Sequence, residues 1–251
     1  MHTCSTHAHV PRRPRFSQIP LAYLSGPSFA KEMMAAHPMS VVVASDDIEV
    51  ARRVQTAMNS QRFRIYISDD VIGVEVGGAL KNPLAIGAGM CAGLGFGQST
   101  VAGLVTRGCR EMATLAVALG GKAETLSGLS GVGDLMLTCF SSLSRNNRCG
   151  QALAKGKSVE QICADMGEVV EGVPTAAEVV LLAKKHNLRL PLFFACAQVI
   201  EGEKDALVAL KELMSAPPGQ ETFTMVIPTD TGAAGEAKAD EAPIYTKTDT
   251  A

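Results

Sequence analysis

Residues 74–90, with the sequence VEVGGALKNPLAIGAGM, constrain the fold more than any other part of the chain. They are apolar or small almost throughout, and from Val71 onward the apolar positions recur at helical spacing. So many small residues suit helices that pack closely together. No stretch reaches the roughly 18 uninterrupted apolar residues that a membrane span requires, so the sequence predicts no transmembrane segment.

Lys81 lies in the middle of this apolar run and is the only cation between Arg64 and Arg107. One interpretation is structural: the side chain lays its methylenes along apolar neighbours and keeps its ammonium in water. The other is catalytic, because a lysine in a poorly hydrated site can exchange a proton near neutral pH. The run by itself favours the structural interpretation, since most lysines are surface residues.

Composition excludes several classes of protein. The 251 residues carry 23 basic and 25 acidic side chains, and this net charge of −2 gives no reason to expect nucleic acid or an anionic membrane as partner. The seven cysteines are widely spaced without a C-x-x-C pair, which argues against a zinc site or a disulfide framework. We expect no metal site, a reducing cytoplasmic compartment and one or two domains.

The two ends of the chain differ from the middle. The first twenty residues hold three arginines and no acid, as organelle transit peptides do, but Pro11 and Pro14 would break an amphipathic helix. We expect an unstructured leader over 1–20, with organellar targeting as the alternative to a cytoplasmic location. Residues 218–251 are rich in Thr, Ala, Gly and charge without a period, which predicts a disordered tail.

Local patterns predict the elements between these ends. A β-branched run at 39–45, a helix opened by Asp46 and Asp47, and an alternating run at 62–68 form one strand–helix–strand unit. One such unit is too little sheet for a domain. The remaining patterns are helical. They predict a long helix ending at Gly120-Gly121, a helix with a Ser158/Gln161 capping box ending at Gly167, and helices opening at Pro174, Pro191 and Asp205.

Three polar clusters interrupt the helical half: Lys81 with Asn82, Asp134 after GLSGVG, and Ser144, Arg145 and Asn146 in SSLSRNNR. Taken alone, Asp134 is better explained as a helix N-cap and Arg145 as a solvated loop residue. Together, the clusters offer a lysine and a carboxylate for proton transfer to an oxygen, and a guanidinium fork for an anion. They predict a site for a small phosphorylated or carboxylated substrate.

Residues 87–92, GAGMCA, match the letters of the dinucleotide fingerprint G-x-G-x-x-A. That fingerprint requires a strand before it and a helix opening from it. Here the letters lie inside a helical stretch that Pro83 is expected to interrupt. We therefore reject them as a cofactor site.

Four segments, in this order and spacing, resemble nicotinamide-dependent glycerol-3-phosphate dehydrogenase of the bacterial type: LSGPSFAKE, VEVGGALKNPLAIGAGMCAGLGFG, GLSGVGDLMLTC and SRNNR. The resemblance runs from about Leu24 to Met214. It implies an oxidoreductase that transfers hydride between NAD(P)H and dihydroxyacetone phosphate, giving sn-glycerol 3-phosphate. It also implies NAD or NADP as cofactor and a homodimer.

The resemblance further implies a mainly α fold. A helical C-terminal substrate domain of the 6-phosphogluconate-dehydrogenase-like type, over 70–217, would follow a small α/β remnant of a Rossmann domain, over 21–69. The family's opening strand and G-x-G-x-x-G have no counterpart before Leu24. The chain therefore looks like a truncated gene product or an incomplete gene model, and we expect it to bind no NAD(H) by itself.

Residue roles also follow from the resemblance. Lys81 matches the general acid/base that protonates the ketone oxygen, and Asp134 matches the carboxylate that orients it. The implied substrate-binding residues are Gly26, Ser28, Lys81, Asp134, Ser144, Arg145 and Asn146. The implied cofactor contacts are Ala30, Arg145, Val169 and Glu171.

Two other interpretations stay open. A β-hydroxyacid dehydrogenase relative would have a similar layout and a carboxylate substrate, although SRN and GDLMLTC favour phosphate. A non-catalytic remnant that dimerises or binds substrate is the alternative from another class, because the nucleotide-binding half is missing.

Overall fold

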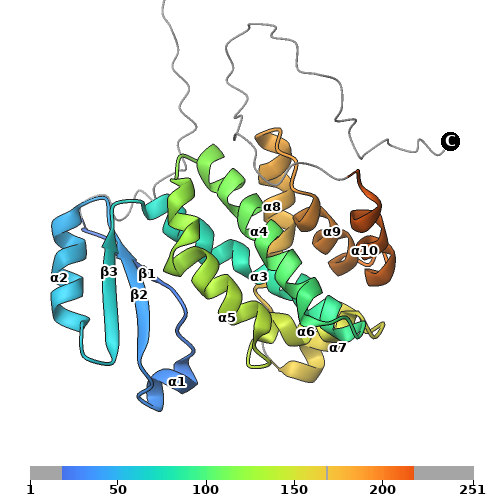
Figure 1. Cartoon of the computed structure of the whole chain (residues 1–251), viewed down its shortest axis with the longest axis horizontal. Helices are drawn as coiled ribbons and strands as arrows, with labels where there is room; N and C mark the ends of the chain where they lie inside the picture. The colour runs from blue at the N-terminus through green and yellow to red at the C-terminus, as the bar shows by residue number, and fades with distance from the viewer. Residues whose placement is uncertain (1–18, 168, 218–251) are drawn as a thin grey trace, which may run out of the picture.

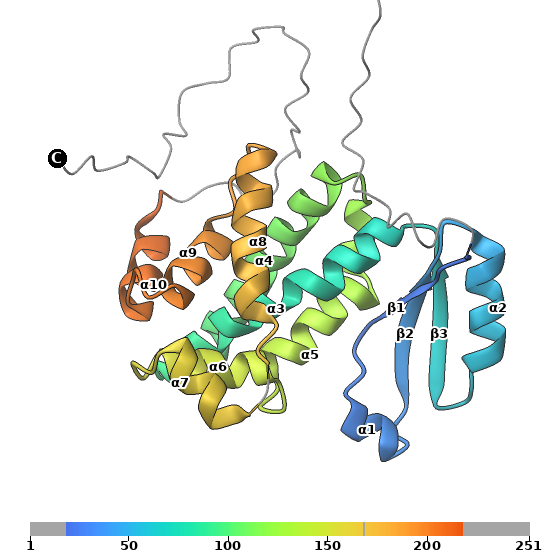
Figure 2. The same ribbon diagram turned by 180° about the vertical axis from the view of Figure 1, so that it is seen from behind.

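The computed structural model describes residues 19–167 and 169–217. Figures 1 and 2 show a small sheet with one helix against it at one end of the molecule and a group of helices that forms the rest. This arrangement confirms the mainly α fold class. The expected leader, apart from Ile19 and Pro20, and the expected tail lie outside the described residues.

The sheet has three strands in the order β1 (Tyr23–Ser25), β2 (Met39–Ala44) and β3 (Phe63–Ser68). β2 and β3 are parallel and are joined through α2 (Ile48–Met58), which confirms the predicted strand–helix–strand unit. β1 pairs antiparallel with β2 and was not predicted. A three-residue strand has too little alternation to be recognised, and only its partner identifies it.

The two faces of the sheet have different neighbours. Val41, Val43 and Ile65 form a small buried core with Ala51 of α2. Because side chains alternate along a strand, Val42 and Tyr66 lie on the opposite face, which the helical region partly covers. α2 begins at the predicted place, where the Asp47 side chain accepts a hydrogen bond from the Glu49 amide.

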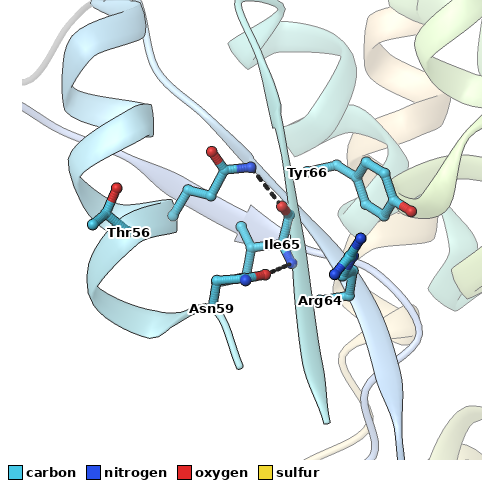
Figure 3. Close-up of a pocket in the computed structure, with 6 residues that line it drawn as sticks. Thr56, Asn59, Arg64, Ile65 and Tyr66 are labelled. Carbon is cyan, nitrogen blue, oxygen red and sulfur yellow. Dashed lines mark hydrogen bonds between the residues drawn. The ribbon is translucent and has the colours of Figure 1, made fainter. Parts of the chain in front are cut away.

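The free edge of β3 is capped by side chains of α2. Figure 3 shows the Gln55 amide donating to the Ile65 carbonyl oxygen at 2.7 Å, and the Asn59 carbonyl accepting from the Ile65 amide at 3.0 Å. Both backbone groups of Ile65 are thus bonded without another strand. An unpaired edge invites pairing with other chains, and this arrangement blunts it.

The helical region consists of α3 (Val71–Gly93), α4 (Gln98–Ala118), α5 (Asp134–Phe140), α6 (Arg145–Leu153), α7 (Val159–Met166), α8 (Gly172–Lys185), α9 (Pro191–Ile200), α10 (Ala206–Ser215) and the short turns η2 (Ala123–Ser127) and η3 (Leu129–Gly133). A five-residue α1 (Ala30–Met34) links β1 to β2. The Ser158/Gln161 capping box and the stop at Gly167 are confirmed. α8 begins two residues before the predicted Pro174.

α3 lies at the centre of the helices in both views (Figures 1 and 2). It runs unbroken through Pro83, so the expected interruption is wrong. Residues 87–92 are helical and almost all buried, which agrees with rejecting them as a cofactor fingerprint. α3 and α6 can approach closely because glycines face the partner helix. A Cβ at Gly89 would overlap the Asn147 carbonyl, and a Cβ at Gly150 would overlap the Ile86 carbonyl.

Two apolar clusters flank α3. Phe193 and Leu84 are fully buried in the first, and each such side chain contributes on the order of 2–3 kcal/mol through burial. The described cysteines are free thiols, and burial raises the pKa of Cys196 to about 12. Among residues 19–167 and 169–217, no helix combines the length and apolarity needed to cross a membrane.

Asp70 joins the sheet to the helical region. One carboxylate oxygen caps α3 through the Gly73 amide, and the other accepts from the Lys122 amide at 2.9 Å and the Thr125 hydroxyl at 2.6 Å. These bonds hold the end of β3 against η2, 52 to 55 residues further along the chain. The sheet is therefore fixed in place relative to α3.

Candidate active site

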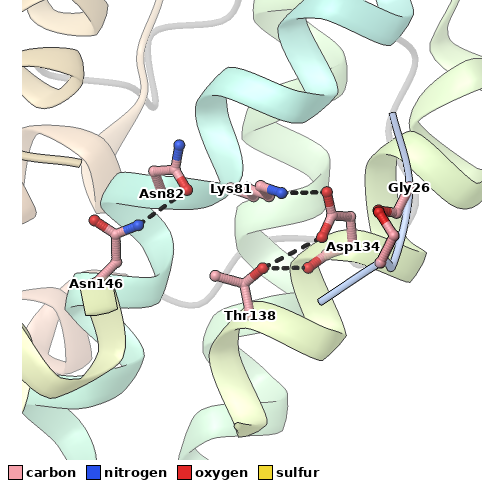
Figure 4. A network of polar contacts seen from close by, with 7 residues as sticks. Gly26, Lys81, Asn82, Asp134, Thr138 and Asn146 are labelled. Carbon is pink, nitrogen blue, oxygen red and sulfur yellow. Dashed lines mark hydrogen bonds and ion pairs between the residues drawn. The ribbon is translucent and has the colours of Figure 1, made fainter. Parts of the chain in front are cut away.

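Lys81 and Asp134 form an ion pair within the helical region. The Lys81 ammonium donates to Asp134 Oδ2, across 53 residues of sequence (Figure 4). The Asp134 side chain is 5% exposed and that of Lys81 is 22% exposed. The ammonium is therefore bound to a buried carboxylate, and the catalytic role of Lys81 stays a prediction.

Asp134 is held by the backbone on both sides of it. η3 is a π-turn that ends at Gly133, and α5 begins at Asp134 without a side-chain cap. The N-cap interpretation of Asp134 is therefore wrong. One turn later, the Thr138 hydroxyl lies 2.7 Å from the Asp134 carbonyl oxygen and 3.4 Å from its Oδ1. Thr138 thus contacts one carboxylate oxygen of Asp134, and Lys81 bonds the other.

Burial dominates the electrostatics of the pair. It raises the pKa of Asp134, and the Lys81 charge and the hydrogen bonds from Lys81 and Thr138 only partly oppose this effect. The carboxylate is thus held with its charge poorly solvated and needs its cationic partner. Such tension between burial and a specific charge is typical of functional sites.

A second polar network lies one residue along α3. Asn146 Nδ2 donates to Asn82 Oδ1 at 3.0 Å (Figure 4). Asn146 Oδ1 accepts from the Gly172 amide at 2.9 Å. All three residues are buried. The network fixes the start of α6 and the start of α8 next to Lys81.

Ser144 and Arg145 open α6. The Ser144 hydroxyl caps the helix by accepting from the Asn147 amide at 3.2 Å. Arg145 is exposed at the first position, directly before buried Asn146. The structure therefore brings Arg145 to the helix end nearest Asn82, and the position of its guanidinium relative to Lys81 stays a prediction.

The segment after β1 approaches the same place. Ser25 Oγ lies 3.1 Å from where a Cβ of Gly78 would be, one turn before Lys81 on α3, and Pro27 packs near Gly133. Gly26 has a φ of +137°, a conformation open to glycine, and its backbone lies against Val41. The Ser28 hydroxyl donates to the Gly26 carbonyl at 3.0 Å. Gly26 and Ser28 thus lie beside the Asp134 end of the pair.

The implied cofactor residues Ala30, Val169 and Glu171 are exposed; Ala30 opens α1, and the other two lie just before α8. The connections that follow the two parallel strands, Ser45–Asp47 after β2 and Asp69–Asp70 after β3, carry carboxylates in place of glycines. Carboxylates repel a pyrophosphate, which prefers bare amides at a helix N-terminus. The described residues therefore do not fit the phosphate part of a dinucleotide.

Thr138 was not predicted as a site residue, and Asn82 was placed in a polar cluster with Lys81 without a role of its own. Thr138 could have been found from its position four residues after Asp134 on one helix face. Asn82 had only its place next to Lys81 in an apolar run as a signal. Its partner lies 64 residues away, beyond the reach of local patterns.

The fold is that of the helical C-terminal domain of a dehydrogenase. A family model described as NAD-dependent glycerol-3-phosphate dehydrogenase C-terminus matches residues 70–211. The chain therefore belongs to the NAD-dependent glycerol-3-phosphate dehydrogenase family, whose cofactor is NAD or NADP.

Individual relatives agree with this assignment. Glycerol-3-phosphate dehydrogenase [NAD(P)+] of Dechloromonas aromatica is 48% identical over 198 residues, 79% of this chain and 60% of that protein. A chloroplastic enzyme of Arabidopsis thaliana is 46% identical, over 80% of this chain and 48% of that protein. The crystal structure of glycerol-3-phosphate dehydrogenase from Coxiella burnetii superposes with a TM-score of 0.76 and 41% identity, over 78% of this chain and 60% of that one. The chain thus spans about 60% of the length of its bacterial relatives.

Proposed function

We propose that the chain carries the substrate-binding and proton-transferring part of a glycerol-3-phosphate dehydrogenase, which interconverts dihydroxyacetone phosphate and sn-glycerol 3-phosphate with NAD(P)H. The observation that carries this proposal is the Lys81–Asp134 pair, buried on helices of a chain that belongs to this family. Residues 70–217 would form the catalytic domain and residues 21–69 the remaining part of the nucleotide-binding domain.

Reduction of the ketone needs one proton at its oxygen. Lys81 is the donor in this proposal, because its ammonium is the cation paired with the buried carboxylate and its side chain is partly exposed. Asp134 orients the ammonium and keeps it charged until the carbonyl oxygen gains electron density. Thr138 then acts as a positioning residue through Asp134. Such a positioned acid typically accelerates a reaction by about 10²–10⁴-fold.

Recognition of the phosphate is assigned to the start of α6. Arg145 offers a guanidinium fork, and Ser144 and Asn146 flank it at a helix N-terminus, where the backbone dipole favours an anion. Gly26 and Ser28 contribute backbone and hydroxyl contacts from the opposite side. A β-hydroxyacid dehydrogenase relative, which binds a carboxylate substrate, would need only one ion pair here and not the whole cluster.

The nicotinamide supplies the hydride, and its main binding region is not among the described residues. Ala30, Arg145, Val169 and Glu171 are proposed as contacts to the rim of the cofactor. We also propose a homodimer and a cytoplasmic location, with an organellar location as the alternative.

Binding of substrate to the chain itself tests the first half of the proposal. We expect saturable binding of sn-glycerol 3-phosphate by titration calorimetry, weakened about ten- to 150-fold in Arg145→Ala, since a charge-assisted fork is lost. Arg53→Ala, an exposed arginine on α2, is the matched control and should bind as the unaltered chain does. Equal affinity in Arg145→Ala would remove Arg145 from the site.

Activity tests the second half. The N-terminal region of the Dechloromonas aromatica enzyme, joined ahead of Leu24, would provide the nucleotide-binding half. We expect this chimera to oxidise NADH with dihydroxyacetone phosphate, and Lys81→Met to lower kcat about 10²-fold or more while substrate still binds. A chimera that folds and binds both ligands without turnover would favour the non-catalytic remnant.

A further inference from the structure

A cavity lies between the sheet and the η2–η3 segment, on the face of the sheet away from α2. Its volume is about 430 Å³, within the range of roughly 300–1,000 Å³ typical of small-molecule sites. Val42 and Leu129 contribute apolar walls. Five hydroxyl-bearing side chains also line it: Ser40, Tyr66, Ser68, Thr125 and Ser130.

Ser130 is a buried residue of the lining whose hydroxyl has no hydrogen-bond partner. It is 1% exposed, and its Oγ is the one buried side-chain nitrogen or oxygen among the described residues without a hydrogen bond. The backbone of Ser130 is held in place by α3. It packs directly against Gly77, so closely that a Cβ at Gly77 would overlap the Ser130 carbonyl. A buried hydroxyl without a partner costs about 1–3 kcal/mol, so a polar ligand here would gain that hydrogen bond.

The charge around the cavity selects the kind of ligand. None of the lining side chains is charged. Behind the wall, the Thr125 hydroxyl donates to the Asp70 carboxylate, so a negative charge lies close to this side of the cavity. The lining therefore offers no cation to hold a phosphate, unlike the cluster proposed to bind phosphate at α6.

We propose that this cavity binds a small uncharged polyol, with Ser130 as the buried hydrogen-bonding partner. Each hydroxyl of a polyol can both donate and accept a hydrogen bond, which matches the hydroxyl-rich wall. The C–H faces of a polyol can pack against Val42, Leu129 and the Tyr66 ring. Figure 3 shows that ring on the side of β3 away from α2, where the cavity lies. The inference does not depend on the proposed dehydrogenase reaction.

Xylitol is the probe, added to the ¹⁵N-labelled full chain and followed by amide chemical shifts. We expect saturable shifts confined to residues 128–133 and the facing parts of β2 and β3, with a Kd on the order of millimolar for so small a ligand. Ser130→Ala should weaken binding about two- to tenfold, and Ser40→Ala should do so from the opposite wall. Thr106→Ala, an exposed hydroxyl on α4 outside the cavity, should leave binding unchanged.

Each other outcome counts against the proposal. Absence of saturable shifts, or equal binding in Ser130→Ala, would overturn it. Inorganic phosphate binding more tightly than xylitol at the same amides would refute the uncharged class. Without xylitol, Ser130→Ala should unfold at the same or a higher temperature, because an unpaired buried hydroxyl is removed. A lower temperature would mean that water already satisfies Ser130, and the proposal would fail.

Discussion

The sheet region and the helical region of this chain are stabilised very differently. The sheet region has one small core of four buried apolar residues, Val41, Val43, Ala51 and Ile65. The helical region has two large clusters that flank α3. A small three-stranded sheet is marginal by itself, so the sheet here depends on its attachment to the helices through Asp70.

Polar groups differ between the regions in the same way. In the sheet region they cap local elements, as Asp47 and Gln55 do. In the helical region, buried polar side chains find partners far along the sequence, such as Asn146 with Asn82 and Glu111 with the start of α9. The candidate site therefore lies among buried side chains that are bonded across long stretches of sequence.

The largest expected effect comes from the contact between α3 and α6. Gly150→Ala would place a methyl group into the Ile86 carbonyl, so the two helices would have to separate. We expect a loss of about 4 kcal/mol or more in the free energy of unfolding, measured by urea denaturation. Gly103→Ala is the matched control, since nothing lies within 4 Å of its Cβ position in α4.

Gly103→Ala should gain about 0.5–1 kcal/mol, because alanine is the better helix former. The same chemical change would thus have opposite signs at two helical glycines. Similar stabilities for the two variants would mean that α3 and α6 are not in close contact. The comparison between a dense helical region and a loose sheet region would then lose its main support.

Glu111 should make the helical region sensitive to pH. Its carboxylate accepts from the Leu192 amide at 3.0 Å and the Phe193 amide at 3.3 Å. Burial raises the pKa of Glu111 to about 8, against these hydrogen bonds and the nearby Arg107 and Arg110. Because the folded chain then holds a proton that the unfolded chain has lost, stability falls as pH rises from about 4.5 to about 8.

Glu111→Gln keeps an acceptor for α9 and removes the charge. We expect the variant to be more stable than the unaltered chain by about 3 kcal/mol at pH 8.5, and by much less at pH 5. Urea denaturation at the two pH values measures this difference. A pH-independent difference would show that the raised pKa is wrong and that Glu111 stays ionised as an anionic helix cap.

Much of the fold could be predicted from local patterns. The strands at 39–44 and 63–68, α2, the capping box at Ser158 and the stop at Gly167 all follow from residues within a few positions of one another. β1, η2 and η3 could not be predicted in this way. η3 depends on Gly131, whose backbone lies so close to Leu126 that a side chain would overlap it.

In the candidate site, too, some features could be read from local sequence and others needed the structure. The polar clusters around Lys81, Asp134 and Arg145 were visible in the sequence, but only the family resemblance assigned them roles. The bonds of Thr138 to Asp134 and of Asn82 to Asn146 needed the structure. Pro83 misled the prediction of α3, because the packed neighbours of that helix outweigh one lost backbone hydrogen bond.

A smaller effect is expected at the edge of the sheet. Gln55→Ala would leave the Ile65 carbonyl without its 2.7 Å hydrogen bond. We expect a loss of about 1 kcal/mol in stability and more light scattering at high protein concentration, because an open edge favours strand pairing between chains. Thr56→Ala, next to it on α2 and bonded only to Arg52, is the control. Equal scattering would mean that Gln55 does not protect the edge.

The smallest expected change in stability lies at the candidate site itself. Burial raises the pKa of Asp134 despite Lys81, so ionising this carboxylate costs the folded chain more than the unfolded chain. Asp134→Asn keeps the shape and removes the cost of burying the carboxylate, but it also leaves the Lys81 ammonium without its anion. Because the two effects oppose one another, we expect a net change within about 1 kcal/mol at neutral pH, and the part due to ionisation of Asp134 should shrink as pH falls toward the usual carboxyl range. Glu49→Gln, which removes the exposed ion pair with Arg52 on α2, is the control and should change the free energy of unfolding by close to zero at every pH. Urea denaturation and the activity of the chimera must be measured on the same variants. A clear loss of stability in Asp134→Asn would make the pair a stabilising ion pair, whereas unchanged stability with lost turnover would assign it to chemistry.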